Sequence, residues 1–262
     1  MPKSLLSQKV SARLKALVKW FVPASVYRPA RIWWGRRKPV RNSTRRRLTP
    51  VSRNFGFDRG LCIDRYYIEA FLQRHSSDIQ GRVLEVLDRQ YTRKFGGARV
   101  TQSDVLHAVS GNREATIVGD LSTGKNIPHL AFDCLIVTQT LHLIYDVRSA
   151  IANCYAALKP GGVLLATFPA ISQISRYDSD RWGDYWRFTK MSVDRLCRES
   201  FPTQQVEIVG HGNVFVAISY LDGLAAQDLL PSELDFHDPD YEIIITARLV
   251  KPTAGADECR DR

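Results

Sequence analysis

The sequence predicts an α/β fold in which helices cover both faces of a mostly parallel, doubly wound sheet. Short apolar runs recur along the chain and are continuous rather than alternating, which indicates strands that are buried on both faces. Segments with helical periodicity lie between these runs. The 262 residues are 44% hydrophobic and 24% charged, a globular composition in a chain long enough for a sizeable core.

The first 50 residues differ in charge from the rest. They contain 14 Lys and Arg residues and no Asp or Glu, whereas the whole chain has 37 basic and 27 acidic residues. The formal charge of +10 therefore belongs to this segment, and the remainder carries a net charge of −4. We expect a basic arm and linker at 1–50, a folded domain at 51–252 and a tail at 253–262.

The arm begins with a pattern typical of a basic amphipathic helix. Apolar residues of 4–22 recur at spacings of three and four, with basic residues between them, and Pro23 ends the pattern. Such a helix binds anionic membrane surfaces, and clustered arginines also bind nucleic acid. A solvated extension is the third interpretation. The acidic domain makes nucleic acid the weakest of the three.

The elements of the domain follow from the apolar pattern. A helix is expected at 64–74, where one stripe is apolar. Continuous apolar runs predict strands at 82–86, 99–103, 115–118, 133–138 and 163–167. A helix at 147–158 is closed by a Lys-Pro-Gly-Gly turn before the fifth strand. Later segments predict a helix at 192–200, strands at 205–209 and 241–249, and helical structure around 214–230.

The five cysteines do not predict a metal or a disulfide framework. They are scattered and lack paired spacing, and Cys134 and Cys154 lie in apolar runs. No apolar run is long enough to span a membrane. We therefore expect reduced, buried thiols, a cytoplasmic protein and no metal site.

Polar residues stand where the predicted strands end, and ligands of such sheets bind at the carboxyl ends of strands. The first strand ends at Glu85, the second at Asp104, the third at Asp120 and the fourth at Gln139. A carboxylate about 20 residues beyond the first strand suits ribose hydroxyls. One strand further, Asp120 suits an adenine amino group.

Several stretches together resemble the class I S-adenosylmethionine-dependent methyltransferases, in particular the type 11-like members that act on small molecules. They are Val83-Leu84-Glu85-Val86, Ser103-Asp104-Val105, Gly119-Asp120-Leu121, Phe132-Asp133-Cys134, Leu158-Lys159-Pro160-Gly161-Gly162 and the Tyr-Trp-Arg-Phe-Thr segment at 185–189. The resemblance implies a Rossmann-like, seven-stranded sheet whose last strand is antiparallel. It also implies S-adenosylmethionine as cofactor.

One part of the family pattern is missing. The family has a glycine-rich turn after the first strand, and here Leu87, Arg89 and Tyr91 stand at the three glycine positions. Glycine permits a positive φ and close backbone approach to a ligand. The stretch from Glu85 to Asp104 is also shorter than in the family, so a trimmed helix is expected there.

The resemblance implies a role for particular side chains. Cofactor contacts are expected from Glu85, Leu87, Asp104, Asp120, Leu121, Gln139, Tyr66 and Tyr67. Residues 64–67 precede the first strand, where the family covers its cofactor, and tyrosine faces can hold a sulfonium. His142 and Asp184 are candidate general bases. Trp182, Tyr185 and Arg187 are expected over the acceptor pocket, although Arg187 and Asp184 could instead form a structural ion pair.

The leading hypothesis is an enzyme, a methyltransferase that O-methylates a sugar, glycoside or related small molecule. Residues 1–50 would add peripheral contact with the inner membrane surface. The alternative is a non-catalytic methyltransferase-like module that acts as an interaction partner in a glycan pathway. An RNA methyltransferase is disfavoured by the acidic domain and by the lack of an Asn-Pro-Pro-Tyr-like motif after the fourth strand.

Overall fold

The computed structural model describes residues 47–253 of the chain. The amphipathic pattern at 4–22 and all but the first residue of the expected tail lie outside these residues. Among the described residues, no helix is long and apolar enough to cross a membrane. The part from 47 to 253 holds no cluster of side chains that could bind a metal ion.

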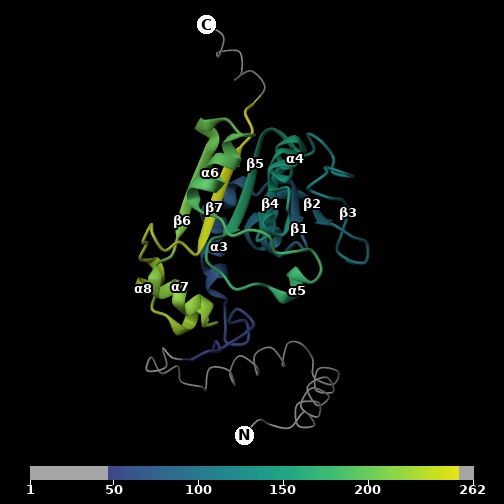
Figure 1. The fold of residues 1–262 in the computed structure, drawn as a ribbon. Coiled ribbons are helices and arrows are strands. Elements are labelled where there is room, and N and C mark those ends of the chain that lie inside the picture. The colour runs from purple at the N-terminus through teal and green to yellow at the C-terminus, as the bar shows by residue number, and fades with distance from the viewer. Residues whose placement is uncertain (1–46, 254–262) are drawn as a thin grey trace.

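One seven-stranded sheet forms the centre of the domain (Figure 1). Its order is β3-β2-β1-β4-β5-β7-β6, in which β7 is antiparallel to both of its neighbours and the other pairs are parallel. The strands are β1 (Gly81–Val86), β2 (Val100–His107), β3 (Ile117–Val118), β4 (Phe132–Thr138), β5 (Leu158–Pro169), β6 (Val206–His211) and β7 (Ile244–Val250). The seven-stranded sheet with an antiparallel last strand is confirmed.

Helices cover both faces of the sheet and form two apolar cores (Figure 1). One core packs α4 (Val147–Ala157) and α6 (Lys190–Arg198) against the sheet, and the other packs α3 (Ile63–Arg74) and α7 (Val214–Leu221) against the opposite face. Successive residues of a strand alternate between the two cores, as Cys134 and Leu135 of β4 do. This burial on both faces is why the strands have continuous apolar runs. Short helices α5 (Arg176–Ser179) and α8 (Pro231–Asp235) lie in the connections.

Several expected elements have other bounds in the structure, and Lys159–Gly162, expected as a turn before the fifth strand, lies within β5. Two further differences bear on the site and the surface. The second strand does not end at Asp104 but continues to His107, because Val105 and Leu106 extend its buried run. The helical pattern at 214–230 is not one helix. It breaks after α7 at Gly223, whose φ is +75° and at which a Cβ would lie 2.2 Å from the Ser52 carbonyl oxygen.

The connection between β1 and β2 is short, as expected from the sequence. It consists of a five-residue π-helical turn, η3 (Thr92–Gly96), and a single 3-10 turn, η4 (Gly97–Arg99). The four described cysteines are free and buried, which confirms the prediction for Cys134 and Cys154.

Candidate cofactor and acceptor site

A cleft of about 1530 Å³ lies at the carboxyl ends of β1, β2, β3 and β4. The strand order reverses between β1 and β4, and open α/β sheets bind their ligands at such a switch point. Residues 50–61, the N-terminal part of α3 and the loop after β5 form the other walls. The volume exceeds the roughly 300–1,000 Å³ of a typical small-molecule pocket, so a cofactor and an acceptor could lie in it together.

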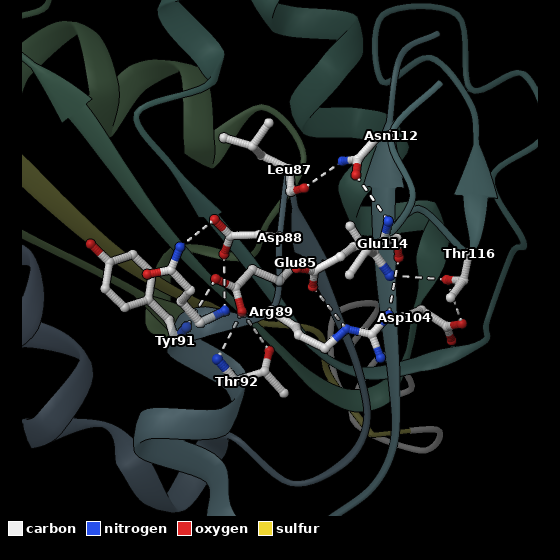
Figure 2. Close-up of polar contacts among 12 residues, drawn as sticks. Glu85, Leu87, Asp88, Arg89, Tyr91, Thr92, Asp104, Asn112, Glu114 and Thr116 are labelled. Atoms are coloured by element: carbon white, nitrogen blue, oxygen red, sulfur yellow. Dashed lines mark hydrogen bonds and ion pairs between the residues drawn. The ribbon is translucent and has the colours of Figure 1, made fainter. Parts of the chain in front are cut away.

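The turn after β1 adopts a left-handed backbone although it lacks glycine. Leu87 has a φ of +80° and its side chain is 59% exposed in the cleft. Its N–H donates to the Leu106 carbonyl oxygen at 3.0 Å, and Asn112 Nδ2 donates to the Leu87 carbonyl oxygen at 2.6 Å (Figure 2). The turn therefore has a positive φ at the position of the family's first glycine and holds it with hydrogen bonds to neighbouring segments.

Glu85 lines the cleft, but its carboxylate binds its own chain. Oε1 accepts the Tyr91 N–H at 3.1 Å, and Oε2 accepts the Thr92 N–H and hydroxyl, both at 2.7 Å (Figure 2). Burial raises the pKa of the Glu85 carboxyl to about 7, while these three donors act in the opposite direction. Glu85 thus fixes the start of the connection to β2.

Asp104 does not line the cleft, so the prediction that it ends β2 and meets a ribose there is corrected. Its carboxylate is buried and accepts hydrogen bonds from Arg82 Nε at 2.7 Å and from the Thr116 hydroxyl at 2.9 Å. Gln102 Nε2 donates a third at 3.1 Å. Because β2 continues past it, Asp104 lies within the sheet, and His107 is the polar residue that β2 presents to the cleft.

Asp120 and Leu121 line the cleft at the end of β3, as expected. Oδ1 of Asp120 accepts the Ser122 N–H at 2.8 Å, and Oδ2 accepts the hydroxyls of Ser122 and Thr123. Burial opposes ionisation, but these bonds lower the pKa of the Asp120 carboxyl below its ordinary value. Oδ1 retains a lone pair for a further donor.

The two tyrosines predicted to contact the cofactor lie elsewhere. The hydroxyl of Tyr66 donates to Asp235 Oδ1 and that of Tyr67 to the Leu234 carbonyl oxygen, each at 2.6 Å, in a separate small pocket. Helix α3 turns a different side toward the cleft, and Asp64 and Arg65 lie on it. Tyr91 does line the cleft, and its hydroxyl accepts a hydrogen bond from Arg65 at 3.2 Å.

Two buried side-chain atoms in the cleft lack hydrogen-bond partners in the described structure. No N–H or O–H group donates to Asp64 Oδ1, while Oδ2 accepts a long hydrogen bond of 3.4 Å from Gln139 Nε2. The buried Cys62 thiol also lies within hydrogen-bonding reach of the Asp64 carboxylate. His142 Nδ1 also has none. Burial lowers the pKa of His142 to about 4, although the nearby Asp184 charge raises it, so its imidazole is neutral near pH 7. Gln139 and His142 therefore lie in the site as expected, and Asp64 joins them.

The loop after β5 closes over the cleft through a buried ion pair. Arg187 binds both carboxylate oxygens of Asp184, at 2.5 and 2.9 Å, and donates to the Gln173 carbonyl oxygen at 3.0 Å. The Asp184 side chain is 1% exposed. Burial opposes ionisation, but the Arg187 guanidinium lowers the Asp184 pKa. Asp184 and Arg187 thus form the ion pair that was one of the two interpretations of the sequence. Asp184 is therefore unsuited to act as a general base.

Aromatic side chains of the same loop reach both ends of the cleft. The Trp182 ring packs edge-on against His107, with centroids 5.6 Å apart. Tyr185 and Trp186 pack on Tyr145, at 5.4 and 5.8 Å, and all three are exposed. Tyr145 and Tyr185 line the cleft, whereas Trp186 does not. Trp182, Tyr185 and Arg187 all line the cleft.

Residues 79–166 match the family model described as a methyltransferase domain. The resemblance to class I S-adenosylmethionine-dependent methyltransferases is confirmed. This match spans β1 to β5 and the glycine-poor turn, and the sheet order beyond it is that of the same fold. The cofactor of this family is S-adenosylmethionine.

Three solved structures illustrate the similarity. The N-methyltransferase NodS of Bradyrhizobium japonicum, in complex with S-adenosylhomocysteine, is 16% identical over 73% of this chain and 89% of its own, with a TM-score of 0.47. A SAM-dependent methyltransferase of Archaeoglobus fulgidus is 11% identical, with 71% and 94% covered and a TM-score of 0.48. A phosphoethanolamine N-methyltransferase of Haemonchus contortus is 14% identical, with 79% and 54% covered and a TM-score of 0.47. The comparison with curated proteins found no match.

The residues of the cleft fit this cofactor in part, and they depart from the family pattern at the glycine-free turn, at Glu85 and at the end of β2. The left-handed turn at Leu87 and the strand-end Asp120 occupy the expected positions. The orphaned Asp64 Oδ1 suits an N–H or O–H donor. At the end of β2, however, His107 stands where the family's ribose carboxylate is expected. Asp88, in the turn after β1, also lines the cleft and offers a carboxylate there.

Proposed function

We propose that this methyltransferase O-methylates a sugar, a glycoside or a related small hydroxylated molecule. The observation that carries the proposal is the combination of an exposed aromatic rim with orphaned acceptors deeper in the same cleft. Sugars present C–H faces that stack on aromatic rings, and their hydroxyls donate hydrogen bonds to groups such as Asp64 Oδ1 and His142 Nδ1.

The cleft supplies orientation and a proton acceptor. S-adenosylmethionine, when bound, supplies an activated methyl group on a cationic sulfur. Orientation of the acceptor hydroxyl by the rim and by the loop that Arg187 holds is worth up to roughly 7–11 kcal/mol of the barrier. We assign proton acceptance to Asp64, which contributes about 10²–10⁴-fold as a general base. His142, with a pKa of about 4, is a weaker base and instead accepts a hydrogen bond that positions the substrate.

A non-catalytic module is the second candidate, and one observation favours it. The carboxylates of Glu85 and Asp104, which the sequence assigned to the cofactor, are both taken up by the chain itself. A domain that had lost its cofactor would keep such structural bonds. The orphaned oxygen of Asp64 is harder to explain in that case, because a buried acceptor without a ligand destabilises the fold.

Calorimetric titration of S-adenosylmethionine and S-adenosylhomocysteine into the full chain separates the two candidates. The enzyme proposal expects saturable binding, and no heat at millimolar ligand would refute it in favour of the module. If binding occurs, methyl transfer from labelled S-adenosylmethionine to a panel of sugars and glycosides tests the acceptor class. Asp64→Asn should then retain S-adenosylhomocysteine binding and lose at least tenfold in methyl transfer, while Asp184→Asn should show its main effect on stability.

A further inference from the structure

The surface of α7 that faces away from the sheet is apolar. Its exposed positions follow the spacing of one helix side, and they are Val214, Phe215, Ile218 and Leu221. Helix α8 packs beside α7, and its flanking residues Leu230 and Phe236 are exposed as well (Figure 1). We call these six side chains the α7–α8 face. Soluble proteins seldom leave such a set together on the surface without a partner.

The surroundings of this face are acidic. The chain has no Lys or Arg between Arg198 and Arg248, whereas residues 222–242 contain seven Asp and Glu residues. Two of the seven, Asp222 and Asp228, are ion-paired with Arg47 and Arg59. Asp235 and Asp240, also among the seven, are exposed. The acidic residues of 222–242 would repel an anionic bilayer and attract a cationic partner.

The chain enters the described structure at the end of α7. The Arg47 guanidinium binds Asp222 Oδ1 at 2.6 Å, and the Val51 N–H donates to the Asp222 carbonyl oxygen at 2.8 Å. Asp222 is the C-terminal cap of α7. Residues 1–46 therefore connect to the domain directly beside the α7–α8 face.

These 46 residues have the chemistry that the face requires. They contain 13 Lys and Arg residues and no acid, and their apolar residues between 5 and 21 recur at helical spacing. The 25 residues between that stretch and Arg47 span at most roughly 3.3–3.6 Å each when extended, so reach is no obstacle.

We propose that residues 1–46 cover the α7–α8 face of their own chain. The apolar positions of 5–21 meet the exposed side of α7, and the basic side chains meet the surrounding carboxylates. The sequence alone left three interpretations of this arm open, and an anionic membrane surface was one of them. The acidic residues of 222–242 and the entry point beside α7 favour the intramolecular contact instead.

Hydrogen exchange of the full-length chain, read by mass spectrometry, tests the contact. In the wild type, peptides from 5–21 should exchange slowly, and Ile218→Glu should accelerate them at least tenfold. Ile218 is 60% exposed, so this change removes no core contact. The matched control is Met191→Glu on α6, at a position 83% exposed, which should leave the arm unchanged. Equal exchange of the arm in the wild type and in Ile218→Glu overturns the proposal.

A second variant and a cross-linking measurement keep the proposal testable if Ile218→Glu does not fold. Asp240→Lys leaves the apolar face intact and should accelerate hydrogen exchange of the arm two- to threefold.

Carbodiimide cross-linking of mixed ¹⁴N and ¹⁵N protein should join arm lysines to carboxylates of 222–242 within one chain. Links found only between chains would assign the face to a second copy. Co-sedimentation with phosphatidylglycerol vesicles that Ile218→Glu abolishes would assign it to a membrane, and either result overturns the proposal.

Discussion

The two sides of the cleft use buried polar side chains in different ways. On the β1–β2 side, every oxygen of Glu85 and Asp104 accepts a hydrogen bond from the chain itself. On the side formed by α3 and the end of β4, Asp64 Oδ1 and His142 Nδ1 have no partner. Arg89 Nε and Ser103 Oγ, on the β1–β2 side, also lack a hydrogen-bond partner, but these two residues do not line the cleft. Glu85 and Asp104 stabilise the fold. An unpartnered atom costs about 1–3 kcal/mol per group unless a ligand satisfies it, and among the described residues with such an atom, Asp64 and His142 are the ones that line the cleft.

This difference shows that a residue can keep its position in a family motif and have a different role in this chain. Glu85 stands where the family places a cofactor residue, yet here it caps the segment that replaces the glycine-rich turn. Without glycines the turn has bulkier residues, and the three hydrogen bonds to Glu85 fix where the chain goes next. The predictions that follow test this contrast, beginning with the largest effect.

Glu85→Ala should be the most destabilising change at the site. It leaves two buried N–H groups and one hydroxyl without an acceptor, and each such loss costs about 1–3 kcal/mol. We expect a decrease of about 3–5 kcal/mol in the free energy of unfolding, measured by urea denaturation. Thr92→Val removes one of the three donors and should cost about 1 kcal/mol. A Glu85→Ala variant within 0.5 kcal/mol of wild type, on this roughly 1 kcal/mol scale, would contradict the structural role.

His142 should make stability depend on pH in a defined window. Its pKa is about 4 when folded and about 6.5 when unfolded, so between these values the unfolded state binds more protons. Stability should therefore fall as the pH decreases from 6.5 to 4, by up to about 3 kcal/mol from this residue. His211 has a similarly lowered pKa and contributes in the same window. The measurement is thus the difference between wild type and His142→Gln, which should lack this part of the slope.

Asp104→Ala and Asp120→Ala should separate stability from binding. Asp104→Ala removes the acceptor of Arg82 and Thr116 inside the sheet, so we expect a loss of about 2 kcal/mol in stability and an S-adenosylhomocysteine Kd within twofold of wild type. Asp120→Ala should weaken binding about ten- to hundredfold, since the lost charge-assisted bond is worth roughly 1.5–3 kcal/mol. Calorimetric titration below the melting range checks both. Equal Kd effects in the two variants would show that the assignment of the two carboxylates is wrong.

The fold was predictable because burial leaves a direct record in the sequence. Continuous apolar runs predicted the strands, and the Lys-Pro-Gly-Gly stretch lies close to the junction of α4 and β5, although it belongs to the start of β5 and is not a turn. The strand-end principle also placed Asp120, Gln139 and His142 correctly in the cleft. It failed at Asp104 because the following Val105 and Leu106 extend β2, and a polar residue inside a strand looks like the end of one.

The remaining differences between prediction and structure depend on how a helix is rotated about its axis and on which side chains pair with each other. Whether α3 presents Asp64 or Tyr67 to the cleft is decided by the rotation of the helix, which its packing against α7 and β7 sets. That Asp184 is neutralised by Arg187 was one of two interpretations left open by their spacing, and the loop geometry decides between them. The left-handed Leu87 was not predictable, because positive φ at leucine is rare.

Leu87→Gly should give the smallest effect and the sharpest test of the unusual turn. A non-glycine residue in the left-handed region costs about 1–2 kcal/mol of stability, and glycine removes this strain. Glycine in turn costs about 0.5–1 kcal/mol, because it loses more conformational entropy on folding. We expect a net stabilisation below about 1 kcal/mol in urea unfolding, relative to wild type. Leu87→Ala is the control, because it removes the side chain and keeps the strained backbone, so it should be less stable than the glycine variant. An alanine variant as stable as the glycine one would mean that the turn is not strained. The same two variants also test whether the Leu87 side chain contacts the cofactor. If it does, both variants should weaken S-adenosylhomocysteine binding equally. If only the backbone of the turn contacts the cofactor, binding should be unchanged in both.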